Sequence, residues 1–266
     1  MFAINPFAAL SASVPPGVMQ TYVVIMIVLV AAGTLFDIVH KGSARYFFQN
    51  WRNKKKAREV GGGELVSIGV KTAVVDVLAS GEFCNTKRRI AHLLTMYGFV
   101  LHVVSTIVMV FDFSADSMWP HLWWIGGIMI LVGGYWFWFF IRADVAAEGN
   151  SPFRVMRADL FVLSLLASVT LGLLWAWSQS IVLFGLYIIA TTVLFAGVPW
   201  SKFAHMFFKP AAAFEKRVSE ADGTHQNLPT LTRDDPEQQA RHSMELLRDA
   251  PMDMGLGIKR EAPRHY

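Results

Sequence analysis

The sequence predicts an all-α, polytopic membrane protein with five transmembrane helices, an external N-terminus and a cytoplasmic C-terminus. Three observations predict this fold class. Of the 266 residues, 54% are hydrophobic and only 17% are charged, a composition outside the range of ordinary soluble domains. The apolar residues form long runs. The basic residues occur only in alternate connecting segments, which is the pattern that sets orientation in membranes.

Each apolar run is long enough to cross about 30 Å of hydrocarbon at about 1.5 Å per helical residue. Pro199 interrupts the last run and is expected to kink that helix, because proline removes a backbone hydrogen bond. Asp37 lies near the end of the first run, where we expect a solvated carboxylate at the membrane interface. The expected helices are residues 21–39, 90–111, 119–141, 160–177 and 181–208.

The third of these runs is rich in both aromatic residues and glycine. Trp and Phe crowd its two ends, which predicts aromatic girdles at the two membrane interfaces. Its glycines would permit a neighbouring helix to pack closely. These glycines are Gly126, Gly127, Gly133 and Gly134.

The orientation follows from where the basic residues fall. All 24 Lys and Arg residues lie in segments 41–89 and 142–157 or after Pro199. The remaining connections, 1–20, 112–120 and 178–180, contain none. Because basic residues concentrate on the cytoplasmic side, the first and last helices are expected to leave the N-terminus outside and the C-terminus inside. The net charge of +4 is thus explained by the membrane, and nucleic acid is not expected as a partner.

The predicted domains are a transmembrane domain at residues 1–210, with a basic cytoplasmic insertion at 41–89, and a polar tail at 211–266. The insertion has eleven basic and four acidic residues, so its cluster from Arg52 to Arg58, with Lys54, Lys55 and Lys56, is expected to attract an acidic partner. Residues 64–83 predict an amphipathic helix that lies either on the membrane surface or against a partner. Its apolar side chains are at positions 66, 70, 74, 77 and 78.

The polar tail contains eight basic and ten acidic residues and too few apolar side chains for a core of its own. One short helix is expected within it, beginning at Asp235 as the N-cap with Pro236 at the first helical position. This helix would either dock on a soluble partner or remain a frayed, solvated segment.

Three histidines in or next to the apolar runs are the candidate site. His92 and His102 are both in the run at 90–111, and His205 ends the run at 181–208. An imidazole inside a bilayer needs a partner, and the ligand that best suits two helices carrying histidine is haem b. Cys84 is the only cysteine, which excludes an intrachain disulfide and an iron–sulfur cluster held by this chain alone.

Depth decides which histidines can share a ligand. His92 and His205 are both expected at the cytoplasmic boundary, whereas His102 is ten residues further along, about 15 Å deeper and about 80° around the helix. We therefore expect His92 and His205 to be the two iron ligands. Basic side chains at the same depth could offset the charge of the haem propionates. They are Arg88, Arg89, Lys202 and Lys209.

These features resemble the cytochrome b membrane subunits of the respiratory nitrate reductase gamma type. The resemblance covers roughly residues 20–210 and rests on five helices, two histidines ten residues apart on the second helix, and a motif that ends on the fifth. The matching residues are Arg89, His92, Gly98, Phe99 and His102, then Pro199, Ser201, Lys202 and His205. The basic insertion is more similar to the related membrane subunits of sulfur metabolism, those of the quinone-interacting oxidoreductase and of adenylylsulfate reductase.

In the two-haem members of that family, the fifth helix has another histidine eighteen residues before the last one, and here that position is Tyr187. The resemblance therefore implies one haem between His92 and His205. His102 is left either as the ligand of a second haem or as a hydrogen-bond donor between helices. His92 and His205 could also be interfacial histidines without a cofactor.

Two functions from different classes remain open. The resemblance implies a haem b subunit of the bacterial or archaeal cytoplasmic membrane, which passes electrons between the quinone pool and a cytoplasmic iron–sulfur or flavin oxidoreductase, with adenylylsulfate reductase as one option. The alternative is a cofactor-free anchor that only recruits such a soluble reductase. A transporter is less expected, because the apolar runs lack the charge pairs of an ion-coupled site.

Overall fold

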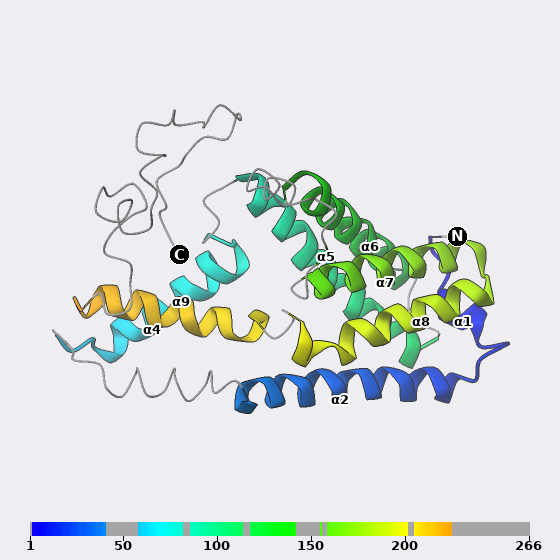
Figure 1. Cartoon of the computed structure of the whole chain (residues 1–266), viewed down its shortest axis with the longest axis horizontal. Coiled ribbons are helices and arrows are strands. Elements are labelled where there is room, and N and C mark those ends of the chain that lie inside the picture. The colour runs from blue at the N-terminus through cyan, green and yellow to red at the C-terminus, as the bar shows by residue number, and fades with distance from the viewer. Residues whose placement is uncertain are drawn as a thin grey trace. The chain divides into compact units, whose positions relative to one another are not determined.

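The computed structural model describes residues 2–40, 58–81, 86–113, 118–141, 155, 159–201 and 205–224, except for the side chains of 205–208. Every regular element in that part of the chain is a helix, in agreement with the predicted fold class (Figure 1). The chain forms two compact units, which we call the bundle and the insert unit. The bundle comprises residues 1–49 and 85–208, and the insert unit comprises 50–84 and 209–266.

Four helices of the bundle are long and apolar enough to cross a membrane, which indicates a multi-pass membrane protein. They agree with the first four predicted runs and are α2 (Pro16–His40), α5 (Thr86–Phe111), α6 (Met118–Trp136) with its π-helical end η2 (Phe137–Ile141), and α7 (Leu160–Ser178). The bundle is completed by the shorter elements α1 (Pro6–Leu10), α8 (Ile181–Ala196) and the 3₁₀ turn η5 (Val198–Trp200).

The prediction of a single helix over residues 181–208, kinked at Pro199, is wrong. α8 ends at Ala196, and Pro199 sits in a 3₁₀ turn in which the Trp200 N–H donates to the Gly197 carbonyl at 3.0 Å. Proline has no N–H for a helical hydrogen bond, and here it ends the helix where we expected a kink. A new helix, α9 (His205–Ala221), begins at the residue that was expected to end the fifth helix.

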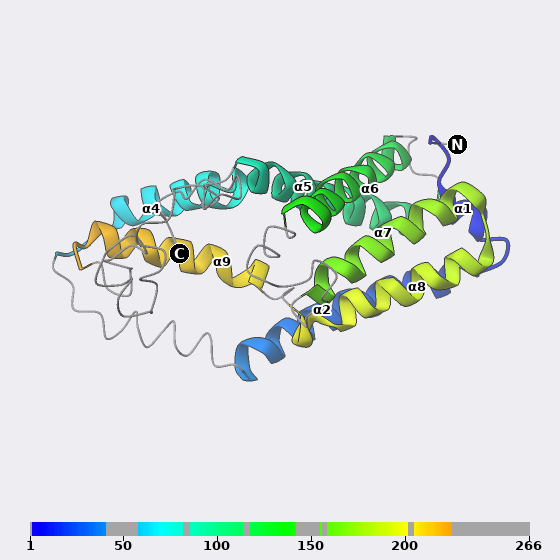
Figure 2. The ribbon, with the colours of Figure 1, turned by 45° about the horizontal axis from the view of Figure 1, so that its top comes forward.

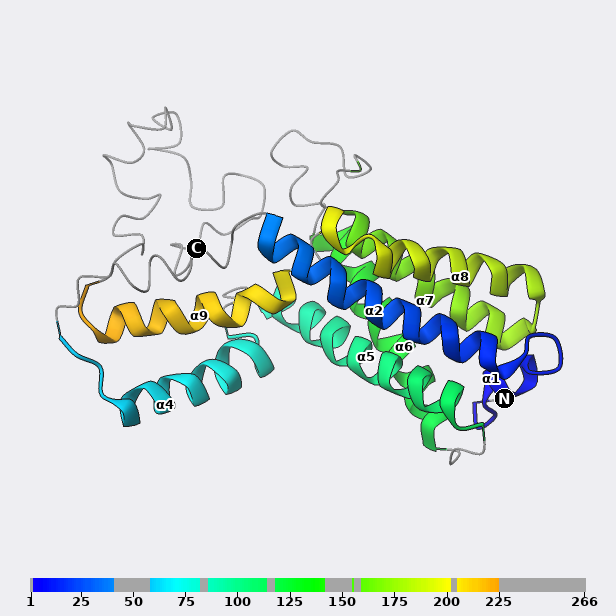
Figure 3. The same ribbon diagram turned by 90° about the horizontal axis from the view of Figure 1, so that it is seen from below.

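The helices of the bundle pack as two pairs, α5 with α6 and α7 with α8 (Figure 2). α2 lies along both α8 and α5 (Figure 3). It also packs on η5, where a Cβ on Gly33 would be 3.1 Å from Val198 Cβ. Asp37, near the end of α2, is only 4% exposed, so the prediction of a solvated carboxylate there is wrong. Gly33, one helical turn before Asp37, packs against Val198 of η5, so this part of α2 lies against protein.

Glycine allows α5 and α6 to approach until backbone touches backbone, as predicted for the glycines of α6. A Cβ on Gly98 of α5 would be 2.7 Å from the Gly126 carbonyl oxygen. On α6, a Cβ on Gly126 would be 2.7 Å from the His102 amide nitrogen, and one on Gly133 would be 2.6 Å from the Ala91 carbonyl oxygen. Such separations are too short for any real side chain, so small residues define this helix pair.

An aromatic cluster fills one end of the bundle. Phe7 of α1 packs edge-on against Trp123 and lies 5.2 Å from the ring of Trp175, centre to centre. Asn5 holds α1 in place by donating from Nδ2 to the Met109 carbonyl at 2.9 Å. Trp123 and Trp124 are 0% and 7% exposed, so the predicted interfacial girdle is wrong for these two residues. Trp123 packs on His102 of α5, and Trp124 packs on Phe2 near the N-terminus.

The insert unit pairs a helix from the insertion with the first helix of the predicted tail. α4 (Gly62–Lys71) continues directly as the π-helical segment η1 (Thr72–Leu78), which confirms a helix over most of residues 64–83. On the other side lies α9, where Arg217 binds Asp76 of η1 through two hydrogen bonds of 2.5 and 2.7 Å. The helix expected at Asp235 lies outside the described residues.

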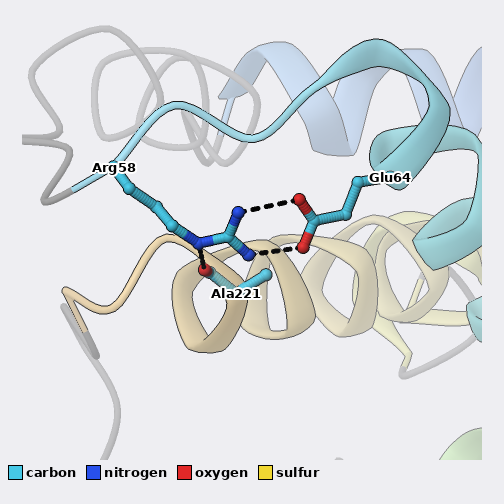
Figure 4. Close-up of polar contacts among 3 residues, drawn as sticks. All are labelled: Arg58, Glu64 and Ala221. Atoms are coloured by element: carbon cyan, nitrogen blue, oxygen red, sulfur yellow. Dashed lines mark hydrogen bonds and ion pairs between the residues drawn. The ribbon is translucent and has the colours of Figure 1, made fainter.

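A second arginine, Arg58, contacts both α4 and α9. Arg58 donates from Nη1 and Nη2 to the two carboxylate oxygens of Glu64, at 2.9 and 2.5 Å, and from Nε to the Ala221 carbonyl at 2.7 Å (Figure 4). The Arg58 guanidinium lowers the pKa of the exposed Glu64 carboxyl. The insertion is therefore connected with the start of the tail by the Arg217–Asp76 pair and by the bond from Arg58 to the Ala221 carbonyl.

Candidate functional site

His102 is the buried histidine of the bundle, and its ring is held in one orientation. It lies on α5 with 6% of its surface exposed, and its Nδ1 is 2.9 Å from the Trp123 carbonyl oxygen. Because a carbonyl only accepts hydrogen bonds, Nδ1 carries the proton, and in the neutral ring Nε2 is left unprotonated. The imidazole also stacks on the Trp123 indole, with ring centres 4.6 Å apart.

Thr106, one helical turn beyond His102, completes this network. Its hydroxyl donates to the His102 carbonyl at 2.7 Å and accepts from the Trp123 indole N–H at 2.9 Å. Gly127 leaves room for the histidine ring, because a Cβ there would be 3.3 Å from His102 Nδ1. The α5–α6 contact thus fixes the tautomer of His102 as well as the direction of its ring.

His102 lines a cavity of about 910 Å³ between α2, α5, α7 and α8. That volume is near the upper end of the roughly 300–1,000 Å³ typical of small-molecule and cofactor sites. Most of its wall is formed by Val, Leu, Ile, Met and Phe side chains. The polar side chains in the wall are those of Tyr22, Thr34, His102, Thr106, Ser168, Tyr187 and Thr191.

Most of these polar groups are satisfied by neutral neighbours. The hydroxyls of Ser168 and Thr191 are 2.7 Å apart, and Tyr22 bonds to Thr192 at 2.9 Å. Tyr187 stacks nearly parallel on Trp175, with ring centres 5.8 Å apart. The hydroxyl of Thr34, in contrast, is buried and has no hydrogen-bond partner among the described residues. Buried hydroxyls are seldom left unpaired, so Thr34 is a candidate contact for a bound molecule.

One residue of the cavity wall has the arrangement of an iron ligand. The donor best suited to bind iron is a histidine whose Nδ1–H is held by a backbone carbonyl, because that bond orients the ring and leaves Nε2 for the metal. His102 has this arrangement, and it faces a large apolar cavity. Tyr187, from α8, lines the same cavity. Tyr187, which stands where two-haem members of the resembled family have a histidine, therefore shares a cavity with His102.

The other predicted site residues lie elsewhere. His92 is half-buried on α5 and is not among the residues that line the cavity. Arg88 is exposed and Arg89 half-buried in the first turn of the same helix. His205 begins α9, but its side chain is outside the described residues, as is the whole of Lys202. The pairing of His92 with His205 therefore stays a prediction.

Several residues that line the cavity or orient His102 were not identified from the sequence. Thr106 could have been found, because four residues after His102 is the position at which a threonine bonds back to a helical carbonyl. Trp123 and Thr34 gave no such signal. Their roles depend on how α6 and α2 pack against α5, and helical periodicity does not specify this packing.

Comparisons of the chain with protein-family models, curated proteins and solved structures gave no match.

Proposed function

We propose that this chain is a haem b-binding membrane subunit that transfers electrons between the quinone pool and a cytoplasmic iron–sulfur or flavin oxidoreductase. The observation that supports this function is the apolar cavity of about 910 Å³ with the oriented imidazole of His102 in its wall. A haem bound there would supply one-electron transfer, and axial ligation and burial would tune its potential.

The chain's own residues would have three tasks at this site. His102 would bind iron through Nε2, while the Trp123 carbonyl keeps its ring from turning. The apolar wall would exclude water, which favours electron transfer at a defined potential over side reactions. Thr34, with its unpaired hydroxyl, would hydrogen-bond a polar substituent of the bound molecule.

The membrane topology of the proposal has five crossings, with the N-terminus outside and the C-terminus in the cytoplasm. α8 has 16 residues and is about 24 Å long, and the three residues of η5 add about 6 Å. Together they match the roughly 30 Å of a bilayer core, so the broken helix can still be a fifth crossing. The predicted loop asymmetry of Lys and Arg supports the orientation.

The soluble partner would dock on the cytoplasmic side, and we propose the Arg52 to Arg58 cluster as its docking surface. Except for Arg58, this cluster lies outside the described residues. An oxidoreductase of sulfur metabolism, adenylylsulfate reductase among them, and a location in the bacterial or archaeal cytoplasmic membrane are proposed on the family resemblance alone.

The test is a reduced-minus-oxidised absorbance spectrum of the purified full-length protein, with haem quantified per polypeptide. We expect a b-type spectrum in the wild type and its near-complete loss in His102→Ala. His121→Ala is the matched control, because His121 is an exposed histidine of α6 outside the cavity wall. It should keep the wild-type haem content.

The His92→Ala variant separates the two possible haem sites. Retention of all haem in His92→Ala places the single haem at His102. Loss of half the haem in each variant means two haems, one of them in the cavity. If His92→Ala removes the haem while His102→Ala keeps it, the cavity is not the haem site. A wild-type protein without haem would favour the cofactor-free anchor.

A further inference from the structure

The helix formed by α4 and η1 exposes a row of large apolar side chains. Val66, Val70, Val74 and Leu78 are 68%, 59%, 52% and 50% exposed. They follow one another at intervals of four residues, so each lies one turn beyond the last. We call these four residues the apolar stripe.

The change from α-helix to π-helix keeps the stripe on one side. In an α-helix, a step of four residues overshoots a full turn by about 40°, so such a row drifts around the helix. A π-helix is wider, with i to i+5 hydrogen bonds such as the one from Ala79 N–H to the Val74 carbonyl at 2.9 Å. Four residues there fall short of a turn. The drift from Val66 to Val74 is therefore reversed between Val74 and Leu78.

The charges of the same helix are arranged so that the stripe lies on a face without exposed acids. Its two carboxylates, Glu64 and Asp76, are bound to Arg58 and Arg217, on the side that meets α9. Phe214 of α9 covers that side as well, 3.8 Å from where a Cβ on Gly69 would be. The exposed face carries one charged residue, the basic Lys71, together with Ser67 and Ala73.

A short segment of chain connects the apolar stripe with the membrane-crossing helix α5. Leu78 ends η1, and α5 begins at Thr86, eight residues later (86 − 78). α5 begins with Lys87, Arg88 and Arg89, the kind of basic turn found where a helix enters a bilayer.

We propose that the apolar stripe lies in the surface of the lipid bilayer, with α4 and η1 parallel to the membrane in the leaflet where α5 begins. A row of valine and leucine with a single lysine at its margin has the chemistry of an interfacial helix, in which the apolar side chains enter the acyl boundary and the lysine reaches the headgroups. The arginine pairs keep both carboxylates of the helix away from anionic lipid. This inference is independent of whether the chain binds haem.

The test is a spin-label accessibility measurement on the full-length protein in lipid nanodiscs. Cys84 is first replaced by Ser, and single cysteines are then introduced by Val70→Cys or Val74→Cys and labelled with a nitroxide. Glu220→Cys is the matched control, because Glu220 is an exposed residue of α9 in the same unit. Collision with apolar oxygen is compared with collision with a water-soluble nickel chelate.

We expect labels at positions 70 and 74 to collide preferentially with oxygen, with an oxygen-to-nickel ratio several times that at position 220. Equal ratios at all three positions would mean that the stripe faces water and would overturn the proposal. Low accessibility to both reagents at 70 and 74 would also overturn it, because another part of the protein would then cover the stripe.

Discussion

The bundle and the insert unit hold their helices together with different polar chemistry. In the bundle, the described polar contacts between helices include neutral ones, such as the pair of hydroxyls on Ser168 and Thr191 and the imidazole of His102 on a backbone carbonyl. In the insert unit, an arginine joins the two helices through a carboxylate, Arg217 of α9 binding Asp76 of η1, and Arg58 binds both the Glu64 carboxylate and the Ala221 carbonyl of α9. The first unit contains the four helices that can cross a membrane, and the second contains none of them.

The surroundings of each unit explain this difference. A charge inside a bilayer is expensive, so helices there associate through close backbone packing and neutral hydrogen bonds of modest strength. Outside the hydrocarbon, water lowers the cost of each charge, and an arginine can select a carboxylate through two parallel bonds. The stability of the bundle should therefore depend on glycine packing, and that of the insert unit on charge, salt and pH.

The largest loss of stability is expected when a glycine between α5 and α6 is replaced. Gly98→Ala places a Cβ 2.7 Å from the Gly126 carbonyl oxygen and 2.9 Å from the Ile130 amide nitrogen, both of which are backbone atoms. The two helices must separate, and overpacking of this kind costs about 3 kcal/mol. Thermal unfolding in detergent measures it. Gly185→Ala is the control, because a Cβ there meets nothing within 4 Å. Equal melting temperatures for both variants would show that α5 and α6 do not pack as described.

Next in size is the ion pair of the insert unit. Asp76 and Arg217 have side chains that are 10% and 20% exposed. Asp76→Ala leaves the guanidinium largely buried without its carboxylate, which should cost about 2 kcal/mol. Amide hydrogen exchange in residues 62–78 should accelerate while exchange in α7 is unchanged. Faster exchange in both regions would mean that the two units unfold together. The double variant Asp76→Leu with Arg217→Met should restore much of the protection.

A smaller loss is expected from a neutral hydrogen bond in the bundle. Ser168→Ala removes the contact with the Thr191 hydroxyl, and such bonds between membrane helices average about 0.6 kcal/mol. Ser178→Ala is the control, because that hydroxyl is exposed and its described bonds are local, to the Leu174 carbonyl and from the Ser180 N–H. A loss above about 2 kcal/mol for Ser168→Ala would show that neutral bonds dominate the bundle.

The smallest effect concerns pH at the exposed contact of Arg58 with Glu64. The contact lowers the pKa of Glu64 in the folded state, so its stabilisation is complete above the ordinary pKa of a glutamate. It is lost as the pH falls through the lowered value, below about 4.5. Amide exchange near the start of α4 should rise over that range in the wild type but change little in Glu64→Gln. High salt at neutral pH should act in the same direction. If amide exchange there responds to neither pH nor salt, the Arg58–Glu64 contact does not stabilise the insert unit.

The helices were predictable wherever their cause is local. Runs such as 90–111 and 160–177 are apolar and long, and the structure has α5 and α7 there. The fifth run was misjudged because hydropathy continues past Pro199, whereas the backbone hydrogen bonds do not. The third run, α6, is apolar on all sides, so its sequence does not say which face meets lipid. The burial of Trp123 depends on the residues of other helices that pack against it, such as Phe7 and His102.

The site was predictable in part. His102 could be identified as a polar residue in an apolar helix. Its partner is the backbone carbonyl of a residue 21 positions away, and because every residue has such a carbonyl, the sequence does not indicate which one it is. The cavity is formed by four helices whose facing surfaces are chosen by packing. His92 and His205 were therefore favoured on depth and on the family resemblance. The feature that the structure adds is the cavity beside His102 and Tyr187.

The central claim, that the cavity beside His102 binds haem, is tested most directly by an experimental density map of the purified wild-type protein at a resolution that shows side chains. We expect density for a planar macrocycle between α2, α5, α7 and α8, joined to Nε2 of His102 through a strong central peak. A cavity filled by branched or threadlike lipid density, or closed by the approach of α2 to α7, would contradict the claim.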